Sequence, residues 1–287
     1  MIPIAIREVT VLGAGQMGSG IAQTFAQHGY QVGLYDIEST AVERGIAGIE
    51  GSLTRFVRKG SLTEEDKSRI MQQIQPSTDL GIANRSQLVI EAVPEKMELK
   101  TAIFQALDSI CMPDAILATN TSSLSITAIA AVTGRPDLVI GMHFMNPVPI
   151  MPLVEIIRGL ATSDATFEQI QTITQQLGKT GVEVQDAPGF VSNRILMPMI
   201  NEAIYTVYEG VAAPEAVDQV MKLGMHHPMG PLTLADFIGL DTCLSIMETL
   251  HQGFSDSKYR PCPLLRKYVS AGWLGRKTGR GFFVYDQ

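Results

Sequence analysis

Short apolar runs alternate with amphipathic stretches over about the first two-thirds of the chain. The apolar runs fall at residues 9–12, 32–35, 88–90, 115–119, 138–142, 153–157 and 181–185. Between most of them apolar residues recur at helical spacing, most clearly over residues 16–27, 99–110 and 167–177. Strands that alternate with helices are typical of a mainly parallel sheet covered by helices. The pattern therefore predicts the α/β fold class for this part of the chain.

The pattern changes near Asp186-Ala187-Pro188-Gly189, where proline and glycine interrupt it. Beyond this point helical spacing dominates, over residues 191–209, 214–223, 232–248 and 264–271. Pro214 suits the first turn of one of these helices. We therefore expect two domains, one with the sheet over residues 1–188 and a smaller all-α domain over residues 189–287.

The composition is that of a globular protein. The 287 residues are 45% hydrophobic and 18% charged, and no apolar run reaches the length that spans a membrane. Residues 1–6 lead straight into a strand pattern, without the basic and apolar regions of a signal peptide. Cys111, Cys243 and Cys262 lie far apart and form no CxxC pair, which fits a reducing compartment. We expect a cytoplasmic protein with no membrane partner and no metal.

The net charge of the chain limits the classes of molecule that it is expected to bind. A formal net charge of −7 argues against a nucleic-acid partner, because such proteins normally carry a basic face. An anionic small ligand stays open, since a local basic patch can bind one. Residues 54–59 include Arg55, Arg58 and Lys59 and suit a polyanion such as coenzyme A. Taken alone, however, a solvated helix face is the better explanation of this cluster.

A glycine-rich motif follows the first apolar run. Gly13-Ala14-Gly15-Gln16-Met17-Gly18 has the form G-x-G-x-x-G and stands between a strand pattern and a helix pattern. Gly13 permits the tight turn, Gly15 lets the backbone approach a pyrophosphate, and Gly18 allows close helix–strand packing. The free N–H groups and the dipole of the helix favour the pyrophosphate there. The next strand pattern ends at Asp36, whose carboxylate can bond both ribose hydroxyls and repels a 2′-phosphate.

Strand, glycines, helix, strand and acid arrive in the order of a Rossmann-type nucleotide-binding domain. We therefore predict NAD as the cofactor, in preference to NADP. FAD shares the same fingerprint and stays open. The structural alternative, a glycine-rich turn with a capping aspartate, carries little weight because all five features occur together.

Polar groups end or interrupt the later apolar runs. His143 ends one run, at the mouth of the predicted sheet, where ligands of such folds bind. Glu155 lies inside the next run, and a buried carboxylate needs a partner, such as a histidine whose basicity it raises. The small polar residues 119–123 suit hydrogen bonds to a ligand. The alternatives are a structural histidine, an exposed glutamate on an edge strand, and helix capping by Ser123 or Ser125.

Six motifs occur in order along essentially the whole chain. They are residues 13–18 with Ile21-Ala22-Gln23, then 120–124, His143-Phe144-Met145-Asn146-Pro147-Val148-Pro149, 188–194, 228–231 and 275–283. Together they resemble the 3-hydroxyacyl-CoA dehydrogenase family, in its short stand-alone form similar to 3-hydroxybutyryl-CoA dehydrogenase. The resemblance implies NAD-dependent oxidation of a (3S)-3-hydroxyacyl-CoA to the 3-oxoacyl-CoA, and the reverse reduction. It also implies short substrates, such as 3-hydroxybutyryl-CoA and acetoacetyl-CoA, and a homodimer formed through the helical domain.

The resemblance implies a role for individual residues as well. His143 would be the base, held and polarised by Glu155, and Ser122 would hydrogen-bond the substrate oxygen. Asn193, from the second domain, would help to hold the substrate. The implied cofactor contacts are Gly13, Gly15, Gln16, Met17, Gly18, Asp36, Glu95, Lys100, Ser122 and Asn146. The implied coenzyme A contacts are Ser52 and Lys59.

Two positions depart from the family pattern. Met145 stands where the family often has a phenylalanine, and Pro152 stands where it commonly has a basic residue. Both can alter the pocket, so the acyl chain length stays open. Two other functions also stay open: a dehydrogenase of a free hydroxyacid or sugar acid, for which Ser52 and Lys59 would be dispensable, and a non-catalytic, crystallin-like NAD-binding protein. The intact catalytic set argues against the second.

Overall fold

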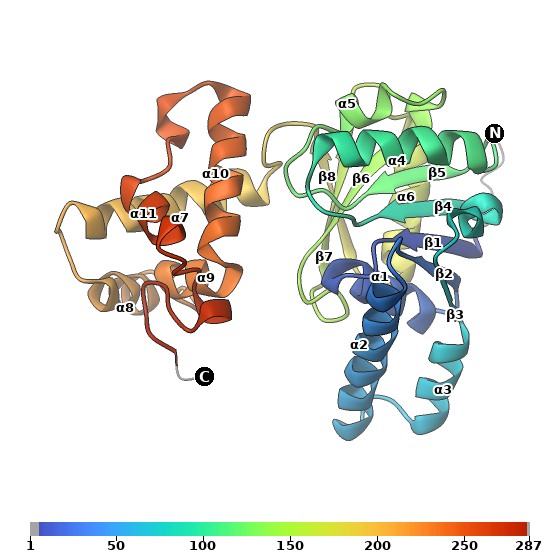
Figure 1. Ribbon diagram of the computed structural model, residues 1–287, viewed down its shortest axis with the longest axis horizontal. Helices are drawn as coiled ribbons and strands as arrows, with labels where there is room; N and C mark the ends of the chain where they lie inside the picture. The colour runs from blue at the N-terminus through green and yellow to red at the C-terminus, as the bar shows by residue number, and fades with distance from the viewer. Residues whose placement is uncertain (1–5, 286–287) are drawn as a thin grey trace. The chain divides into compact units, whose positions relative to one another are not determined.

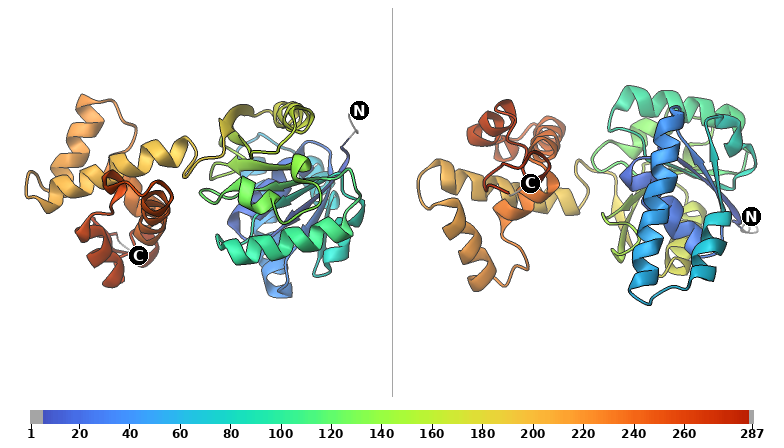
Figure 2. Two further views of the ribbon diagram at one scale, coloured as in Figure 1. Left: turned by 90° about the horizontal axis from the view of Figure 1, so that it is seen from above. Right: turned by 60° about the horizontal axis from the view of Figure 1, so that its bottom comes forward.

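In the computed structural model of the protein, residues 6–285 are described. Residues 1–5, most of the segment considered above for a signal peptide, lie outside the described part of the chain. The chain divides into two compact units, Met1–Asp186 and Ala187–Gln287, whereas the expected boundary follows residue 188. Figures 1 and 2 show the sheet in the first unit and the helical character of the second.

The first unit is built on an eight-stranded sheet. Its strands are β1 (Glu8–Leu12), β2 (Gln31–Tyr35), β3 (Ile74–Ser77), β4 (Leu88–Glu91), β5 (Ile116–Thr119), β6 (Val139–Phe144), β7 (Leu153–Arg158) and β8 (Thr180–Gln185). They lie in the order β3-β2-β1-β4-β5-β6-β7-β8, and neighbours are parallel except for β6 and β7. The first six follow the strand order of dinucleotide-binding sheets. The predicted mainly parallel α/β fold is confirmed.

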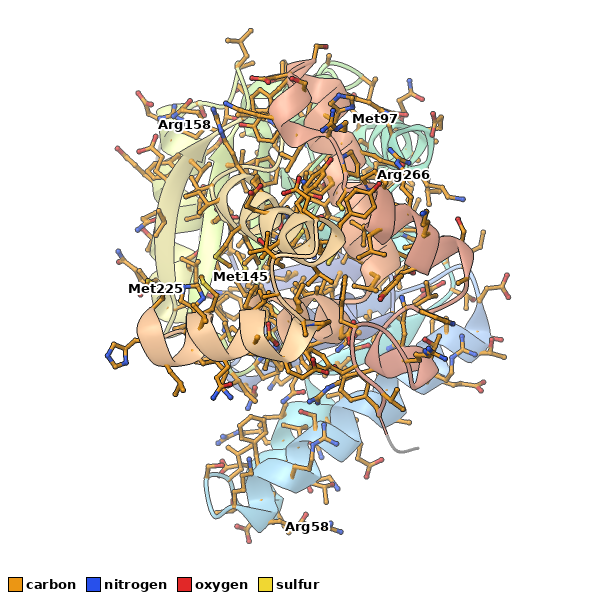
Figure 3. The ribbon with its side chains drawn as sticks, turned by 90° about the vertical axis from the view of Figure 1, so that its left-hand side faces the viewer. Arg58, Met97, Met145, Arg158, Met225 and Arg266 are labelled. Carbon is orange, nitrogen blue, oxygen red and sulfur yellow. The ribbon has the colours of Figure 1, made fainter. Side chains whose placement is uncertain are left out.

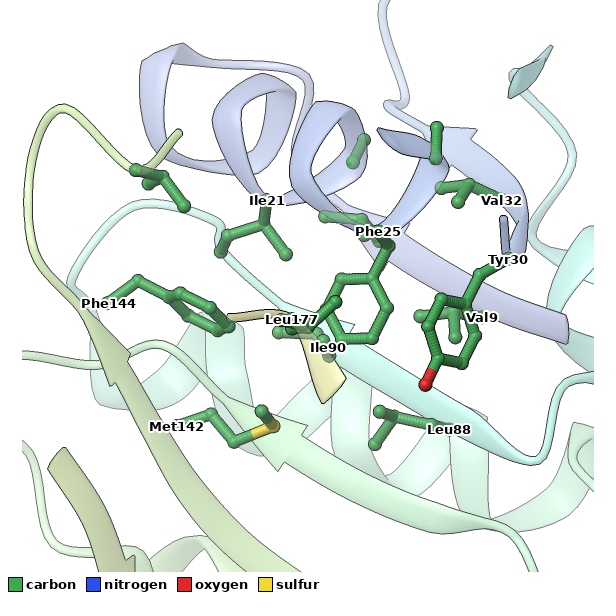
Figure 4. Packing of buried hydrophobic residues seen from close by; sticks show 14 of the residues in the cluster. Val9, Ile21, Phe25, Tyr30, Val32, Leu88, Ile90, Met142, Phe144 and Leu177 are labelled. Atoms are coloured by element: carbon green, nitrogen blue, oxygen red, sulfur yellow. The ribbon is translucent and has the colours of Figure 1, made fainter. Parts of the chain in front are cut away.

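Helices cover both faces of this sheet. They are α1 (Gln16–Gln27), α2 (Ser39–Arg58), α3 (Glu64–Gln72), α4 (Met97–Ile110), α5 (Ile126–Ala130) and α6 (Asp164–Gln176), with the 3-10 turns η1 (Leu80–Arg85) and η2 (Pro136–Leu138). One buried cluster packs α1 and α6 against the strands, and Figure 4 shows Phe25 of α1 near Leu88 and Ile90 of β4. On the other face α5 packs against β6, and α4 packs against α5. Burial on both faces explains why the strands are almost continuously apolar.

The alternation of side chains places three ionisable residues of the strands on one face. Successive residues of a strand point to opposite faces of its sheet. Met142 and Phe144 of β6 belong to the cluster under α1 and α6, so His143 between them points to the face of α4 and α5. By the same alternation Glu91 of β4 and Glu155 of β7 point to that face. His143, Glu91 and Glu155 are thereby kept apart from the main apolar core under α1 and α6.

The apolar pattern does not predict α2, α3 or β3. Figure 1 shows α2 and α3 as a helical pair that extends away from the sheet before the chain returns to β3. A salt bridge of 3.2 Å joins Lys67 of α3 to Glu50 of α2, and Thr63 and Asp66 form a capping box at the start of α3. The strand β3 contains a single buried apolar residue, Ile74, and joins the sheet through its backbone. Such a strand leaves no apolar run in the sequence.

The second unit has its own apolar core. Its helices are α7 (Ser192–Tyr208), α8 (Pro214–Gly224), α9 (Pro231–Ile238), α10 (Leu240–Phe254) and α11 (Pro263–Ser270), with the 3-10 turns η3 (Ser257–Tyr259) and η4 (Arg276–Thr278). Apolar residues of these helices form a buried cluster separate from that of the sheet. The expected single helix over residues 232–248 is wrong, because Gly239 has φ 103° and separates α9 from α10. Only glycine adopts this backbone conformation readily.

Candidate active site

The glycine motif forms the turn between β1 and α1. Gly13 has φ 95°, and a β-carbon there would lie 2.6 Å from the carbonyl oxygen of Ala92. A β-carbon on Gly18 would lie 1.7 Å from the carbonyl oxygen of Gly13, so only glycine allows this packing. Around Gly15, by contrast, nothing lies within 4 Å of a β-carbon position. The loop is closed on the protein side and open at Gly15, as backbone contact with a pyrophosphate requires.

Asp36 follows β2 and lies beside the glycine loop. Its Oδ2 accepts a hydrogen bond from the backbone N–H of Ala14 at 2.8 Å, and its Oδ1 accepts one from the N–H of Glu38 at 3.2 Å. These contacts fix the carboxylate at the carboxyl ends of β1 and β2. A cavity of about 1010 Å³ adjoins it, lined by Gly13, Gly15, Gln16, Met17, Asp36 and Asn146 among others. Its place above the sheet, where the strand order reverses between β1 and β4, is where ligands of such folds bind.

One face of α2 lines the same cavity and is basic. Arg44, Ser52 and Arg55 contribute to the lining, at spacings that bring residues to one side of a helix. Lys59 is the C-cap residue of α2 and is not among the lining residues. Arg58, labelled at the end of α2 in Figure 3, is not among them either. Of the basic cluster at residues 54–59, Arg55 is the member that reaches the cavity, and Arg44 adds a charge that the sequence pattern did not single out.

The loop between β6 and β7 is tied down on both sides. The Oδ1 of Asn146 accepts a hydrogen bond of 3.1 Å from the Nε2 of Gln16, which joins the loop to the start of α1. From the other side, the buried Lys179 donates from Nζ to the carbonyl oxygens of Val148 at 2.6 Å and Met151 at 2.7 Å. Burial lowers the pKa of the Lys179 ammonium. The sequence pattern gave no sign of this lysine, because its role depends on the loop packing over it.

His143 and Glu155 are direct partners across β6 and β7. The His143 Nδ1 lies 2.8 Å from the Glu155 Oε2, and both residues are buried, at 9% and 2% exposure. They meet because β7 runs antiparallel to β6, which places the two residues opposite each other on the same face of the sheet. A carboxylate beside Nδ1 favours the proton on that nitrogen, so that Nε2 is the basic nitrogen of the ring. The arrangement is that of a general base and the group that orients it.

The turn after β5 carries Ser122. The Oδ1 of Asn120 accepts a hydrogen bond of 2.9 Å from the N–H of Phe144, which joins this turn to the end of β6 next to His143. The Glu95 Oε1 accepts hydrogen bonds from the N–H of Ser122 at 2.9 Å and from its hydroxyl at 3.3 Å. Ser122 and His143 therefore come from neighbouring strand ends. The Glu95 carboxylate holds residues 120–123, here called the serine turn.

A lysine keeps this carboxylate charged. The Lys100 Nζ lies 3.3 Å from the Glu95 Oε2 and 2.7 Å from the Oε1 of the fully buried Glu91. Partial burial alone would raise the pKa of Glu95, but the Lys100 charge and the hydrogen bonds from Thr121 and Ser122 outweigh it and lower that pKa. Glu91 was not predicted as a site residue. Its only trace in the sequence is an acid directly after an apolar run.

Two family models match the chain in succession. The model of the 3-hydroxyacyl-CoA dehydrogenase NAD binding domain matches residues 8–187, and that of the C-terminal domain matches residues 189–285. The chain belongs to the 3-hydroxyacyl-CoA dehydrogenase family. The resemblance drawn from the six sequence motifs is confirmed, and so is the prediction of NAD as cofactor. The dehydrogenase is an NAD-dependent oxidoreductase of 3-hydroxyacyl-CoA.

Similar proteins cover the whole dehydrogenase. It is 62% identical over 282 residues to a probable 3-hydroxybutyryl-CoA dehydrogenase of Bacillus subtilis, with 98% of each chain covered. It is 57% identical over 280 residues to a 3-hydroxybutyryl-CoA dehydrogenase of Bradyrhizobium diazoefficiens, covering 98% of this chain and 96% of that one. The crystal structure of an (S)-3-hydroxybutyryl-CoA dehydrogenase from Ralstonia eutropha is 52% identical, with a TM-score of 0.95 over 99% of this chain and 100% of that one. None of these names favours a free-acid or non-catalytic alternative.

The remaining predicted site residue, Asn193, lies in the second unit. It is buried in the first turn of α7, and its backbone N–H donates to the carbonyl oxygen of Gly189 at 3.1 Å. Its contact with substrate stays a prediction, as do the individual roles of the other site residues. Within residues 6–285, no helix is both long enough and apolar enough to cross a membrane. The same part of the dehydrogenase holds no cluster of three or more residues suited to a metal ion.

Proposed function

We propose that this dehydrogenase interconverts (3S)-3-hydroxybutyryl-CoA and acetoacetyl-CoA, with His143 as its catalytic base. The observation that carries the proposal is the buried pair of His143 and Glu155, with 2.8 Å between Nδ1 and Oε2, at the end of the sheet beside the Ser122 turn. The choice of substrate is supported by relatives at 57% to 62% identity that are named for 3-hydroxybutyryl-CoA.

The residues of the glycine loop and the carboxylate of Asp36 fit NAD. The loop is open at Gly15, where a backbone must approach a pyrophosphate, and the Asp36 carboxylate is fixed beside it to meet ribose hydroxyls. The residues that would hold the cofactor are Gly13, Gly15, Gln16, Met17, Gly18, Asp36, Glu95, Lys100, Ser122 and Asn146. When bound, the cofactor accepts the hydride of the substrate carbinol in oxidation and supplies it in reduction.

The side chains around His143 are proposed to transfer the proton and to orient the substrate. In oxidation His143 takes the hydroxyl proton at Nε2, and in reduction it returns that proton to the carbonyl oxygen. Glu155 stabilises the imidazolium that forms and keeps the ring in its orientation. The Ser122 hydroxyl forms a hydrogen bond with the substrate oxygen and so orients the reacting carbon. Asn193 contributes from the second unit to the binding of substrate.

Coenzyme A is proposed to bind along α2. Ser52 lines the cavity and can hydrogen-bond the coenzyme, while Arg55 places a positive charge in the same lining. Lys59, at the end of α2, is retained as a contact for the outer part of the coenzyme. Met145 and Pro152 are proposed to shape the acyl pocket and so to set the preferred chain length.

We assign NAD binding to residues 1–188, and substrate binding and dimerisation to residues 189–287. Large apolar side chains are exposed in the second unit, including Ile195 at 66%, Val220 at 62% and Leu223 at 71%. Exposed apolar side chains of this size favour a protein partner, and we propose a homodimer in the cytoplasm. Sedimentation of the purified protein tests the homodimer. A monomer at micromolar concentration would contradict it.

Loss of NADH absorbance tests the reaction. Purified enzyme and NADH are mixed with acetoacetyl-CoA, with free acetoacetate, or with 3-oxoacyl-CoA thioesters of increasing chain length, and NADPH replaces NADH in a parallel series. We expect fast turnover only with a thioester and NADH, and the highest kcat/KM with acetoacetyl-CoA. A higher kcat/KM with a long thioester would overturn the short-chain proposal, and turnover of free acetoacetate would overturn the coenzyme A requirement.

A further inference from the structure

Glu91 is a buried carboxylate that contacts Lys100, one of the residues proposed to hold the cofactor. It ends β4, is 0% exposed, and is not among the residues that line the cavity. Its Oε1 accepts hydrogen bonds from the N–H of Val93 and the Nζ of Lys100, each at 2.7 Å, and its Oε2 accepts one from the Thr119 hydroxyl at 2.7 Å. Burial of a carboxylate is costly unless donors meet it, and here three do so.

The Lys100 ammonium is held by Glu91 from the interior. Lys100 is 1% exposed, and an ammonium has three donors. Its contacts are the Glu91 Oε1 at 2.7 Å, the Val93 carbonyl oxygen at 3.3 Å and the Glu95 Oε2 at 3.3 Å. The contact with Glu91 is the shortest of the three and the most deeply buried. The position of the ammonium therefore depends mainly on Glu91.

Glu95 connects the Lys100 ammonium to the serine turn. One of its oxygens, Oε2, faces Lys100, and the other, Oε1, accepts hydrogen bonds from the turn. The donors are the Thr121 hydroxyl, and the N–H and hydroxyl groups of both Ser122 and Ser123. A displacement of Glu95 would thus move the whole turn and the Ser122 hydroxyl with it.

We propose that Glu91 is a positioning residue: through Lys100 and Glu95 it holds the Ser122 hydroxyl in the orientation that meets the substrate oxygen. The inference rests on the proposed role of Ser122. If the Glu91 charge is removed, the buried ammonium is left with Glu95 as its carboxylate partner in this cluster and draws it away from the turn. Ser122 then moves because Glu95, which accepts its hydrogen bonds, has moved.

The substitution Glu91→Gln tests this chain of contacts. The matched control is Thr10→Val in β1, which also removes a buried polar contact of the sheet, the 2.7 Å hydrogen bond to Ser86, but does not lead to the serine turn. We measure kcat at saturating NADH and acetoacetyl-CoA, well below the melting temperature of each variant, so that altered cofactor affinity and unfolding do not enter. We expect kcat to fall about 10-fold for Glu91→Gln and to change less than about 2-fold for Thr10→Val.

A double-mutant cycle shows whether the effect passes through Ser122. If it does, adding Glu91→Gln to Ser122→Ala lowers kcat by no more than about 2-fold further. Full multiplication of the two losses, or a Glu91→Gln loss no larger than that of the control, would overturn the inference. A wild-type kcat for Ser122→Ala would overturn the role of Ser122 and this inference with it.

A second variant tests the inference if the Glu91→Gln protein does not fold. Glu91→Asp keeps the charge but is one methylene shorter, so that its carboxylate cannot reach Lys100 and Thr119 together. We expect an intermediate kcat and the same lack of multiplication with Ser122→Ala. A wild-type kcat for Glu91→Asp, or full multiplication with Ser122→Ala, would again overturn the inference.

Discussion

In the first unit of this dehydrogenase the buried carboxylates contact side chains that can carry a positive charge: Glu155 lies 2.8 Å from His143, and Glu91 2.7 Å from Lys100. In the second unit the most deeply buried carboxylate, Asp236, instead accepts hydrogen bonds of 3.0 Å from two backbone N–H groups and a tyrosine hydroxyl of the C-terminal segment 282–285. A carboxylate beside a cation sets the charge of a site. A carboxylate met by backbone donors holds two segments of chain together.

Glu95, the carboxylate beside Lys100 in the first unit, and Asp236 differ in pKa as well. The Lys100 charge and the hydrogen bonds from the serine turn overcome burial and lower the pKa of Glu95. Burial raises the pKa of Asp236, its backbone hydrogen bonds oppose this only in part, and the charge of Asp218 adds to the rise. The comparison teaches that the partners of a carboxylate, together with its burial, decide the direction in which its pKa moves.

Removal of the histidine base should give the largest effect. We expect His143→Gln to lower kcat about 1000-fold, because glutamine cannot take the hydroxyl proton, with the dissociation constant for NADH almost unchanged. The measurements are steady-state turnover and NADH fluorescence titration. His251→Gln, the same change in α10 of the second unit, should keep the wild-type kcat. Full turnover in His143→Gln would contradict the role of His143 as the catalytic base.

Removal of Asp236 should act on stability and leave the chemistry intact. We expect Asp236→Ala to lower the free energy of unfolding by about 3 kcal/mol, because three donors lose a buried, charged acceptor. At a temperature where the variant is folded, kcat should stay within about 2-fold of wild type. Thermal melts and turnover check both values. Asp241→Ala, which removes a 2.6 Å contact with Lys277 between partly exposed side chains, should cost about 1 kcal/mol or less.

Asp36 should sharpen the comparison as a carboxylate that contacts the backbone and is proposed to contact the cofactor. Asp36→Ala removes its hydrogen bond with the Ala14 N–H and the proposed ribose contact. We expect the KM for NADH to rise about 10-fold and the ratio of kcat/KM for NADH over NADPH to fall by a similar factor. Steady-state kinetics with both cofactors gives the ratio, and Glu38→Ala, an exposed acid two residues on, serves as control. An unchanged ratio would speak against the ribose contact.

Opposite pH profiles should give the smallest effects. The pKa of Glu95 is lowered below 4.5 in the folded state, so its contribution to stability is present above that value and is lost as pH falls through the folded pKa. The pKa of Asp236 is raised above 3.8, so the folded state loses stability as pH rises from 3.8 through the folded pKa. Urea unfolding between about pH 3 and about pH 7 measures the two trends as differences from Glu95→Gln and Asp236→Asn. Parallel trends would mean that the partners of the two carboxylates do not differ as described.

The parts of the site that depend on neighbouring residues were predictable from the sequence. Gly13, Gly18 and Asp36 could be recognised because a tight turn, a close helix–strand contact and a carboxylate at the next strand end are local requirements at short spacing. The alternation of apolar runs and helical patterns likewise predicted the sheet. The break between α9 and α10 at Gly239 was not predicted, since a glycine inside an apolar helical pattern does not reveal its φ angle.

The tertiary structure decided the geometry in which distant side chains meet. Glu155 contacts His143 because β7 runs antiparallel to β6 in one register, and strand direction and register are set by packing across the whole sheet. The contacts from Glu91 through Lys100 to Glu95 likewise depend on how α4 returns over the strand ends, and Arg55 rather than Lys59 lines the cavity because of the rotation and length of α2. The sequence by itself determined the nucleotide turn, because local sterics and spacing suffice for it, and it indicated His143 as the candidate base through its resemblance to the family. Glu155 was expected as the partner of the base, whereas Glu91 and Lys179 take their places through long-range packing, which no local pattern encodes.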